Sequence, residues 1–213
     1  MTSGLQIIND SGTVQIDELW RNYGFKQLQN QSVTADSNGI QVSVTATGTN
    51  ILIAPRCETL LVAPMQSYQS GTTWTYKFYF RSFYIGETIT EDVRFYVFDM
   101  LDGAYSNVGL EVFNASGVRT FHSDNPLMKC RAINDCKTSF VGNSGRIYAP
   151  LYTRAPVEAQ FITGVGIRLL AHYMNCPANT VSFSKTEGYL ISSATAIYSN
   201  NGQYAAIDVT GLS

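Results

Sequence analysis

Hydrophobic and polar side chains alternate along much of this chain with a period of two residues. Between residues 40 and 47, apolar side chains occupy every second position: Ile40, Val42, Val44 and Ala46. The side chains between them are Gln, Ser and Thr, and the turn pair Asn38-Gly39 precedes the segment. A period of two is typical of a β-strand with one face buried and the other in water. The segment 40–47 is therefore predicted to be such a strand.

Two segments are unusually rich in aromatic residues. In segment 73–85 one face carries Trp74, Tyr76, Phe78 and Phe80. Segment 93–98 has a similar composition and is followed by the turn pair Asp102-Gly103. An aromatic strand face must bury itself against another sheet or another chain. We expect the two segments to be neighbouring strands of one sheet.

Shorter apolar runs, separated by turn residues, fill the rest of the chain. Pro64 is expected to end the run 59–62, and segment 17–24 fits either a helical turn or an irregular strand. Segment 165–173 has both strand and helix character, and strand is favoured because glycines oppose a helix. About a dozen short strands with little helix result. The predicted fold class is all-β, built as one or two antiparallel β-sandwiches.

One segment occurs twice, at residues 4–16 and 109–121. The two copies share Gly, Leu, Asn, Ser and Gly at matching positions, and their apolar positions also correspond. Each copy is predicted to be a hairpin whose turn is Asn-x-Ser-Gly. The turn residues are Asn9, Ser11, Gly12, Asn114, Ser116 and Gly117. Asn114-Ala115-Ser116 also fits a glycosylation acceptor, but turn chemistry explains these residues sufficiently.

The duplication divides the chain into two halves of similar length. Residues 1–105 would form one sandwich half and residues 106–213 the other, each headed by one hairpin. No linker composition occurs near residue 105, so two repeats in one compact body are favoured over two independent domains.

Composition narrows the classes of function. Charged residues make up only 14% of the 213 residues, while 13 Tyr and 11 Phe are present, so the surface must be weakly charged and rich in tyrosine. Such a surface is expected to be covered by protein partners. The net charge is −2 and no basic run occurs, which excludes nucleic-acid binding. No signal segment or membrane-spanning run is present, so we expect neither export by its own signal nor membrane insertion.

Candidate chemistry is sparse. The cysteines Cys57, Cys130, Cys136 and Cys176 are expected to be reduced, with a Cys130–Cys136 bridge as the alternative. Neither cofactor nor metal is expected, because the two histidines are not at ligand spacing. His122 is predicted to occupy a tolerant surface position, and His172 the core.

Acidic pairs at strand ends are the remaining catalytic candidates. Asp99 and Asp102 form one pair and Glu91 and Asp92 the other, but adjacent carboxylates are usual in turns. No nucleophile elbow, phosphate loop or zinc motif occurs, so the chain is predicted not to be an enzyme.

The repeated segment Gly-Leu-x-[Ile/Val]-[Ile/Phe]-Asn-x-Ser-Gly resembles a recurring segment of small tail-tip and tail-fibre-associated proteins of long-tailed bacteriophages. The resemblance covers about 13 residues in each copy. It implies a β-rich structural virion protein, made in the host cytoplasm and located in the tail, with no catalytic residues to transfer. Other tail proteins are the implied partners, and a host-surface glycan or protein is a further one.

Tail-tip symmetry is threefold or sixfold, which favours a homo-oligomer, most simply a trimer. Two alternatives stay open: a carbohydrate-binding, lectin-like module, and a surface-polysaccharide hydrolase. The polar segment 123–146 has few strand signals and is expected to be an exposed loop that could contact a receptor.

Overall fold

The computed structural model describes residues 6–8, 14–17, 22–100, 108–136, 138–154, 157–162, 166–191 and 202–213. The regular secondary structure of these described residues consists of β-strands alone, and all of the strand pairs are antiparallel. The all-β prediction is therefore confirmed. Several strands are longer than expected, and the longest has 13 residues.

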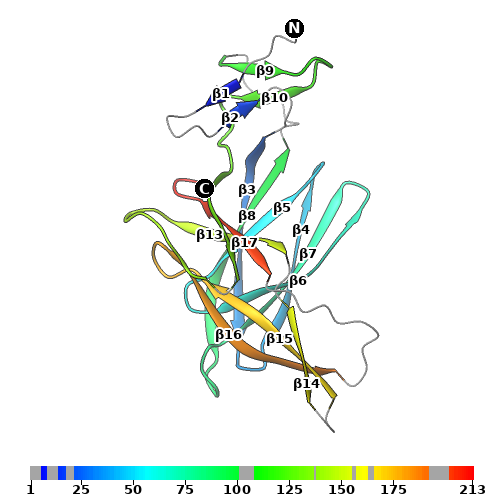
Figure 1. The fold of residues 1–213 in the computed structure, drawn as a ribbon, viewed down its shortest axis with the longest axis vertical. Coiled ribbons are helices and arrows are strands. Elements are labelled where there is room, and N and C mark those ends of the chain that lie inside the picture. Colours follow the sequence, from blue (N-terminus) through cyan, green and yellow to red (C-terminus); the bar gives the residue numbers. More distant parts are fainter. Residues whose placement is uncertain are drawn as a thin grey trace.

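The largest sheet forms one layer of a sandwich (Figure 1). Its order is β12 (Phe140–Val141), β16 (Thr180–Ile191), β15 (Gly166–Asn175), β6 (Leu61–Ser70), β7 (Thr73–Arg81) and β4 (Ile40–Thr47), and β14 (Val157–Ile162) pairs with β15. The strand favoured for segment 165–173 is present as β15.

Two three-stranded sheets and two hairpins complete the described fold. The sheets are β3 (Tyr23–Ala35), β8 (Ile89–Met100), β5 (Leu52–Arg56) and β11 (Lys129–Asp135), β17 (Gln203–Asp208), β13 (Tyr148–Arg154). The hairpins are β1 (Gln6–Ile8) with β2 (Val14–Asp17), and β9 (Glu111–Phe113) with β10 (Arg119–His122). Both hairpins lie at the same end of the long axis (Figure 1).

The aromatic face of β7 packs against the sheet that contains β8. The Phe78 and Phe80 rings lie 5.7 Å and 6.1 Å from the Phe95 ring, and all three side chains are buried in one cluster. The prediction that this face buries itself against another sheet is confirmed. The prediction that the two aromatic segments are neighbours in one sheet is wrong, because β7 and β8 belong to facing layers.

Strand β8 is buried on both faces. Val93, Phe95 and Val97 point into the cluster with β7, whereas Tyr96 and Phe98 point into a second cluster. That second cluster contains residues from both halves of the chain: Tyr96 and Phe98 come from the first half, and Leu151 and Ile207 come from the second. A strand buried on both faces is expected to read as a continuous apolar run, as segment 95–98 does.

The two halves of the chain share both a sheet and a core. Strand β15 joins β6 through the pair Met174 and Val62, so one sheet crosses from the first half to the second. Ala54 and Phe98 from the first half share a buried cluster with Ala149 and Leu151 from the second. The division at residues 105 and 106 therefore does not separate two hydrophobic cores.

Two strand boundaries differ from their prediction. Strand β7 ends at Arg81, because the buried Ser82 turns the chain: its N–H donates to Asp36 O at 2.9 Å and its hydroxyl lies 3.2 Å from the Tyr84 N–H. Pro64 does not end β6, since the strand shifts register between Pro64 and Gln66 and continues.

Segment 123–146 is not a continuous loop. It contains β11, which pairs with β17 over its whole length, and the short β12. Ile133 is exposed in β11, whereas the less exposed positions are Ala132 and Asn134, so its sequence lacks the apolar alternation that identifies a half-buried strand.

Candidate functional site

The two copies of the repeated segment form the same hairpin in the same register. Ile7 pairs with Ile16 in the first copy, and the matching residues Val112 and Phe121 pair in the second. The pairs on either side also correspond. The register of both ladders shifts at the same place. The first hairpin leaves Gln15 of its second strand unpaired in the ladder, and the second hairpin leaves the matching Thr120 unpaired. The sequence repeat is therefore also a structural repeat, including its bulge.

Asn114 organises the turn of the second hairpin. Its Oδ1 accepts hydrogen bonds from the N–H groups of Ser116 at 3.0 Å and Val118 at 2.9 Å. Gly117 has φ of 73°, a conformation that favours glycine. The predicted roles of Asn114 and Gly117 are confirmed, while Ser116 contributes its backbone N–H. The corresponding Asn9, Ser11 and Gly12 lie outside the described residues.

The second hairpin buries one side and exposes the other. Val112 and Phe121 are buried, and they pack with Leu127 in a small cluster separate from the main core. Leu110 and Phe113 are each 49% exposed, and Val108 is more exposed still. This hairpin therefore presents apolar side chains to solvent in addition to a well-formed turn.

His122 is fully buried, so its predicted tolerant surface position is wrong. The chain turns directly after His122, and Leu127 then forms a β-bridge with Gly24 at the start of β3. The returning chain covers the end of β10, where His122 lies buried. His122 Nδ1 accepts a hydrogen bond from the Asp124 N–H at 3.1 Å. Its Nε2 lies 3.4 Å from the Glu111 carboxylate, which also bonds Arg119 at 2.8 Å. The histidine therefore ties both strands of the hairpin to the following turn. The side chain of His172 lies outside the described residues.

A cleft of about 360 Å³ lies where the hairpins join the body. It is lined by Gly24, Phe25, Lys26, Thr47, Gly48, Thr49, Thr72, Asp99, Met100 and Asn125. These residues come from the start of β3, the end of β8 and the adjoining turns. Tyr23 and Met100 are register partners, so the first hairpin precedes and the second follows the same end of the β3–β8 ladder.

Asp99 holds the wall of this cleft together. It is 8% exposed, and its Oδ1 accepts the N–H groups of Asn50 and Met100, each at 2.9 Å. Its Oδ2 accepts Lys26 Nζ at 2.8 Å. A Cβ at Gly48 would lie 2.1 Å from the same Oδ2, so only glycine fits there without displacing the carboxylate. Asp99 therefore has a structural explanation, and its candidate partner Asp102 lies outside the described residues.

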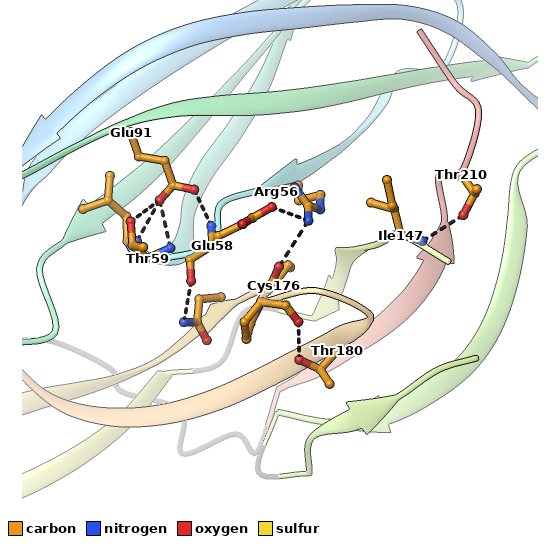
Figure 2. Close-up of polar contacts among 11 residues, drawn as sticks. Arg56, Glu58, Thr59, Glu91, Ile147, Cys176, Thr180 and Thr210 are labelled. Atoms are coloured by element: carbon orange, nitrogen blue, oxygen red, sulfur yellow. Dashed lines mark hydrogen bonds and ion pairs between the residues drawn. The ribbon is translucent and has the colours of Figure 1, made fainter. Parts of the chain in front are cut away.

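The second acidic pair also has structural roles. Glu91 accepts the backbone N–H groups of Glu58, Thr59 and Leu60, and it also bonds the Thr59 hydroxyl at 2.8 Å (Figure 2). It thereby fixes the turn between β5 and β6. Asp92, next to it, is exposed.

Arg56 extends this network into the second half of the chain. Its side chain is buried, with Nη2 2.6 Å from Glu58 Oε1 and 3.4 Å from Cys176 O (Figure 2). The Cys176 N–H donates to Cys57 O at 2.6 Å. These contacts connect the turn after β5 to the turn after β15, and no feature of the sequence pattern identifies them in advance.

All four cysteines are thiols in the structure, including Cys130 and Cys136. Burial raises the pKa of Cys136 and of Cys176 to about 12, and raises that of Cys57 well above its ordinary value. A protonated, buried thiol is a poor nucleophile and a poor metal ligand. Cys130 is exposed.

Within the described part of the chain, no three or more His, Cys, Asp or Glu side chains are grouped to hold a metal ion. The same residues contain no helix with the length and apolar character that a membrane crossing requires. No family model, curated protein or solved structure matches this chain.

Proposed function

We propose that this chain is a structural component of a bacteriophage tail tip or tail fibre and works by assembling with other proteins. The observation that carries the proposal is the hairpin repeat, whose two copies share register and bulge and lie at one end of the body (Figure 1). This is the segment that resembles tail proteins. A duplicated surface element suits a component that contacts similar neighbours at two places.

The exposed side chains of the second hairpin support a contact role. Leu110 and Phe113 face solvent, while their neighbour Val112 is only 4% exposed and holds the hairpin together. Adjoining exposed apolar side chains commonly mark protein interaction sites.

A second apolar site lies at the other end of β8. The turn between β7 and β8 exposes Phe83, Tyr84 and Ile85, and Ile85 is 91% exposed. Ile89 at the start of β8 pairs with Ala35, and Met100 at its far end pairs with Tyr23 near the hairpins. Apolar contact surfaces at opposite ends of the body suit a protein placed between neighbours in an assembly.

Mass spectrometry of purified phage particles from a lysogen or infected host that encodes the chain tests this function. The chain should be present in particles at a copy number that is a multiple of three. Immunogold labelling should place it on the tail. Its absence from intact particles, with the chain present in the same lysate, would overturn the proposal.

Carbohydrate binding is the second candidate function, and the cleft beside Asp99 favours it. The cleft is large enough for a sugar ring, and Lys26, Thr47, Thr72 and Asn125 line it with polar groups. A glycan array with the isolated protein tests this candidate. Defined binding that is weakened by Thr72→Trp would support it, whereas the absence of any retained glycan would exclude it.

A further inference from the structure

One edge of strand β3 has no partner strand among the residues that the structure describes. It is the outermost strand of its sheet and forms its ladder with β8 alone. Its first residues are covered on the other side, where the Phe25 N–H donates to Pro126 O at 2.7 Å and the Met128 N–H donates to Tyr23 O at 2.9 Å. From residue 27 to residue 35, no strand among the described residues pairs with this edge. Such an edge presents backbone N–H and C=O groups to any strand that can reach it.

The free edge lacks the features that usually prevent strands from pairing between molecules. Residues 27–35 read Gln-Leu-Gln-Asn-Gln-Ser-Val-Thr-Ala, without a charge, a proline or a glycine. The ladder shift of β3 lies before this segment, between Phe25 and Gln27. Proteins normally protect long edges with charged residues, proline, bulges or short strands. This nine-residue edge therefore has no such protection.

The other long edges of the described sheets, apart from that of β4, are protected. Each has a charged residue, a proline or a ladder shift: Pro55 and Arg56 in β5, Pro64 in β6, Lys129 and Arg131 in β11, Pro150 in β13, Glu158 in β14, and Lys185 and Glu187 in β16. Strand β4 is the exception in composition, but Gln29 Nε2 from β3 donates to its Thr45 O at 2.9 Å.

That contact also shows how β3 and β4 are placed. Because the Gln29 side chain of β3 reaches a backbone oxygen of β4, the two outer strands lie on the same side of the sandwich. Residues 40–47 of β4 are also uncharged. Asn30, Gln31 and Ser32 of β3 are exposed on both faces of the strand. A neighbour that approaches this side therefore meets no charged side chain on either strand between residues 27 and 35 or 40 and 47.

We propose that residues 27–35 of β3 pair antiparallel with the same segment of a second copy of this chain. Antiparallel pairing of identical strands produces a twofold contact in which residue i of one copy meets residue j of the other and j meets i. In a pairing centred on the middle of the segment, Gln31 meets Gln31 on the axis and Asn30 meets Ser32 on either side of it. Amide side chains both donate and accept hydrogen bonds, so Gln31 can pair with its counterpart, and the uncharged segment places no like charges opposite each other. The inference rests on the proposed assembly function and identifies one partner as the chain itself.

The oligomeric state of the full chain in solution tests this pairing. Light scattering coupled to size-exclusion chromatography should give a dimer or an even multiple. A hexamer made of three such dimers also agrees with sixfold tail symmetry. A monomer at micromolar concentration, or an isolated trimer, would overturn the inference.

Charge substitutions identify the contact. Gln31 is exposed at the centre of the segment, so Gln31→Lys and Gln31→Glu should each weaken the dimer about tenfold by placing like charges across the axis. Mixing the two variants should restore a mixed dimer. Thr88→Lys adds the same charge at an exposed position outside the sheets and should leave the dimer intact.

Circular dichroism should show the same far-UV spectrum and a cooperative thermal transition for the two Gln31 variants and for Thr88→Lys, which excludes misfolding. A Gln31→Lys protein whose dimer dissociation constant equals that of the unsubstituted chain would overturn the inference, as would a mixture of both variants that associates no more tightly than either variant alone. A dimer that is absent from phage particles would remove the proposed function and leave the pairing intact. If phage particles contain the chain but the chain is monomeric in solution and Gln31→Lys changes nothing, the pairing is overturned and the proposed function stays.

Discussion

Lys26 Nζ lies 2.8 Å from Asp99 Oδ2, and this pair joins the start of β3 to the end of β8 beside both hairpins. The two partners are unequal, because the Lys26 side chain is 38% exposed and that of Asp99 only 9%. Lys26 can be hydrated when the pair is broken. Asp99 also accepts hydrogen bonds from two partly buried backbone N–H groups.

Asp99→Ala should therefore destabilise the protein much more than Lys26→Met. Loss of the carboxylate leaves the N–H groups of Asn50 and Met100 without their acceptor, which costs about 2 to 4 kcal/mol. Loss of the ammonium group removes a half-exposed ion pair worth about 1 kcal/mol or less. Urea unfolding of both variants measures the difference. Equal losses would show that the ion pair, and not the backbone contacts, is the main contribution of Asp99.

Glu91→Ala should destabilise the turn between β5 and β6 by about 2 kcal/mol, since three backbone N–H groups lose their acceptor. Asp92→Ala is the matched control, because this neighbouring carboxylate is exposed and should change stability by less than about 0.5 kcal/mol. Chemical unfolding reports the loss, and amide exchange of residues 58–60 locates it. Unchanged exchange at these amides would contradict the assigned role of Glu91.

Stability should fall in acid partly through Asp208. Burial acts to raise its pKa, but hydrogen bonds from Thr210 and Arg131 outweigh it and leave the pKa below its ordinary value. A carboxyl group with a lowered folded-state pKa stabilises the protein above its unfolded pKa, near 4, and this contribution is lost as the pH falls through the folded-state value. Unfolding free energy measured between pH 6 and pH 2.5 should fall less steeply in Asp208→Asn. Identical slopes would contradict the prediction.

Thiol titration of the native protein should detect one fast-reacting cysteine, Cys130. The other three thiols are buried, and burial holds their pKa values above the ordinary value. In denaturant all four should react. Cys130→Ser should abolish the fast phase without affecting the slow one. A fast phase that survives this substitution would mean that a second thiol is accessible in solution.

Phe113→Ser and Val112→Ser should separate assembly from stability. Phe113 is 49% exposed, so its replacement should leave the thermal midpoint within about 2 °C and reduce incorporation into particles. Val112 is buried against Phe121, and a buried hydroxyl there should lower the stability of the hairpin by about 1 to 3 kcal/mol. Normal incorporation of Phe113→Ser would remove this side chain from the contact surface.

The sequence pattern predicts strands well where one face is apolar. The alternation in segment 40–47 corresponds to the buried Val42, Val44 and Ala46 of β4, although Ile40 is exposed. A period of two identifies the buried face of a strand but not its partners, which explains why β7 and β8 were expected in one sheet. Their true separation into facing layers depends on contacts between distant residues.

The site was less predictable from sequence. The repeat correctly indicated two equivalent hairpins, and Asn114 and Gly117 have the expected turn geometry. Burial of His122 depends on the return of the chain past β3, which has no local sequence signal. Glu91 and Asp99 are ordinary acidic residues at strand ends by sequence. Their role as acceptors for backbone N–H groups becomes visible only when the turns they serve are placed in space.

The pairing of Tyr23 with Met100 has a mechanical consequence. A two-stranded ladder twists as a unit, with a fixed right-handed sense for each strand. The chain that follows the second hairpin is bonded to the start of β3, where the Phe25 N–H donates to Pro126 O and the Met128 N–H donates to Tyr23 O. A torsional change along the β3–β8 ladder would therefore reorient this hairpin. Twisting of the sandwich would then be transmitted as rotation of the β9–β10 hairpin, with β8, which is buried on both faces, as the rigid element.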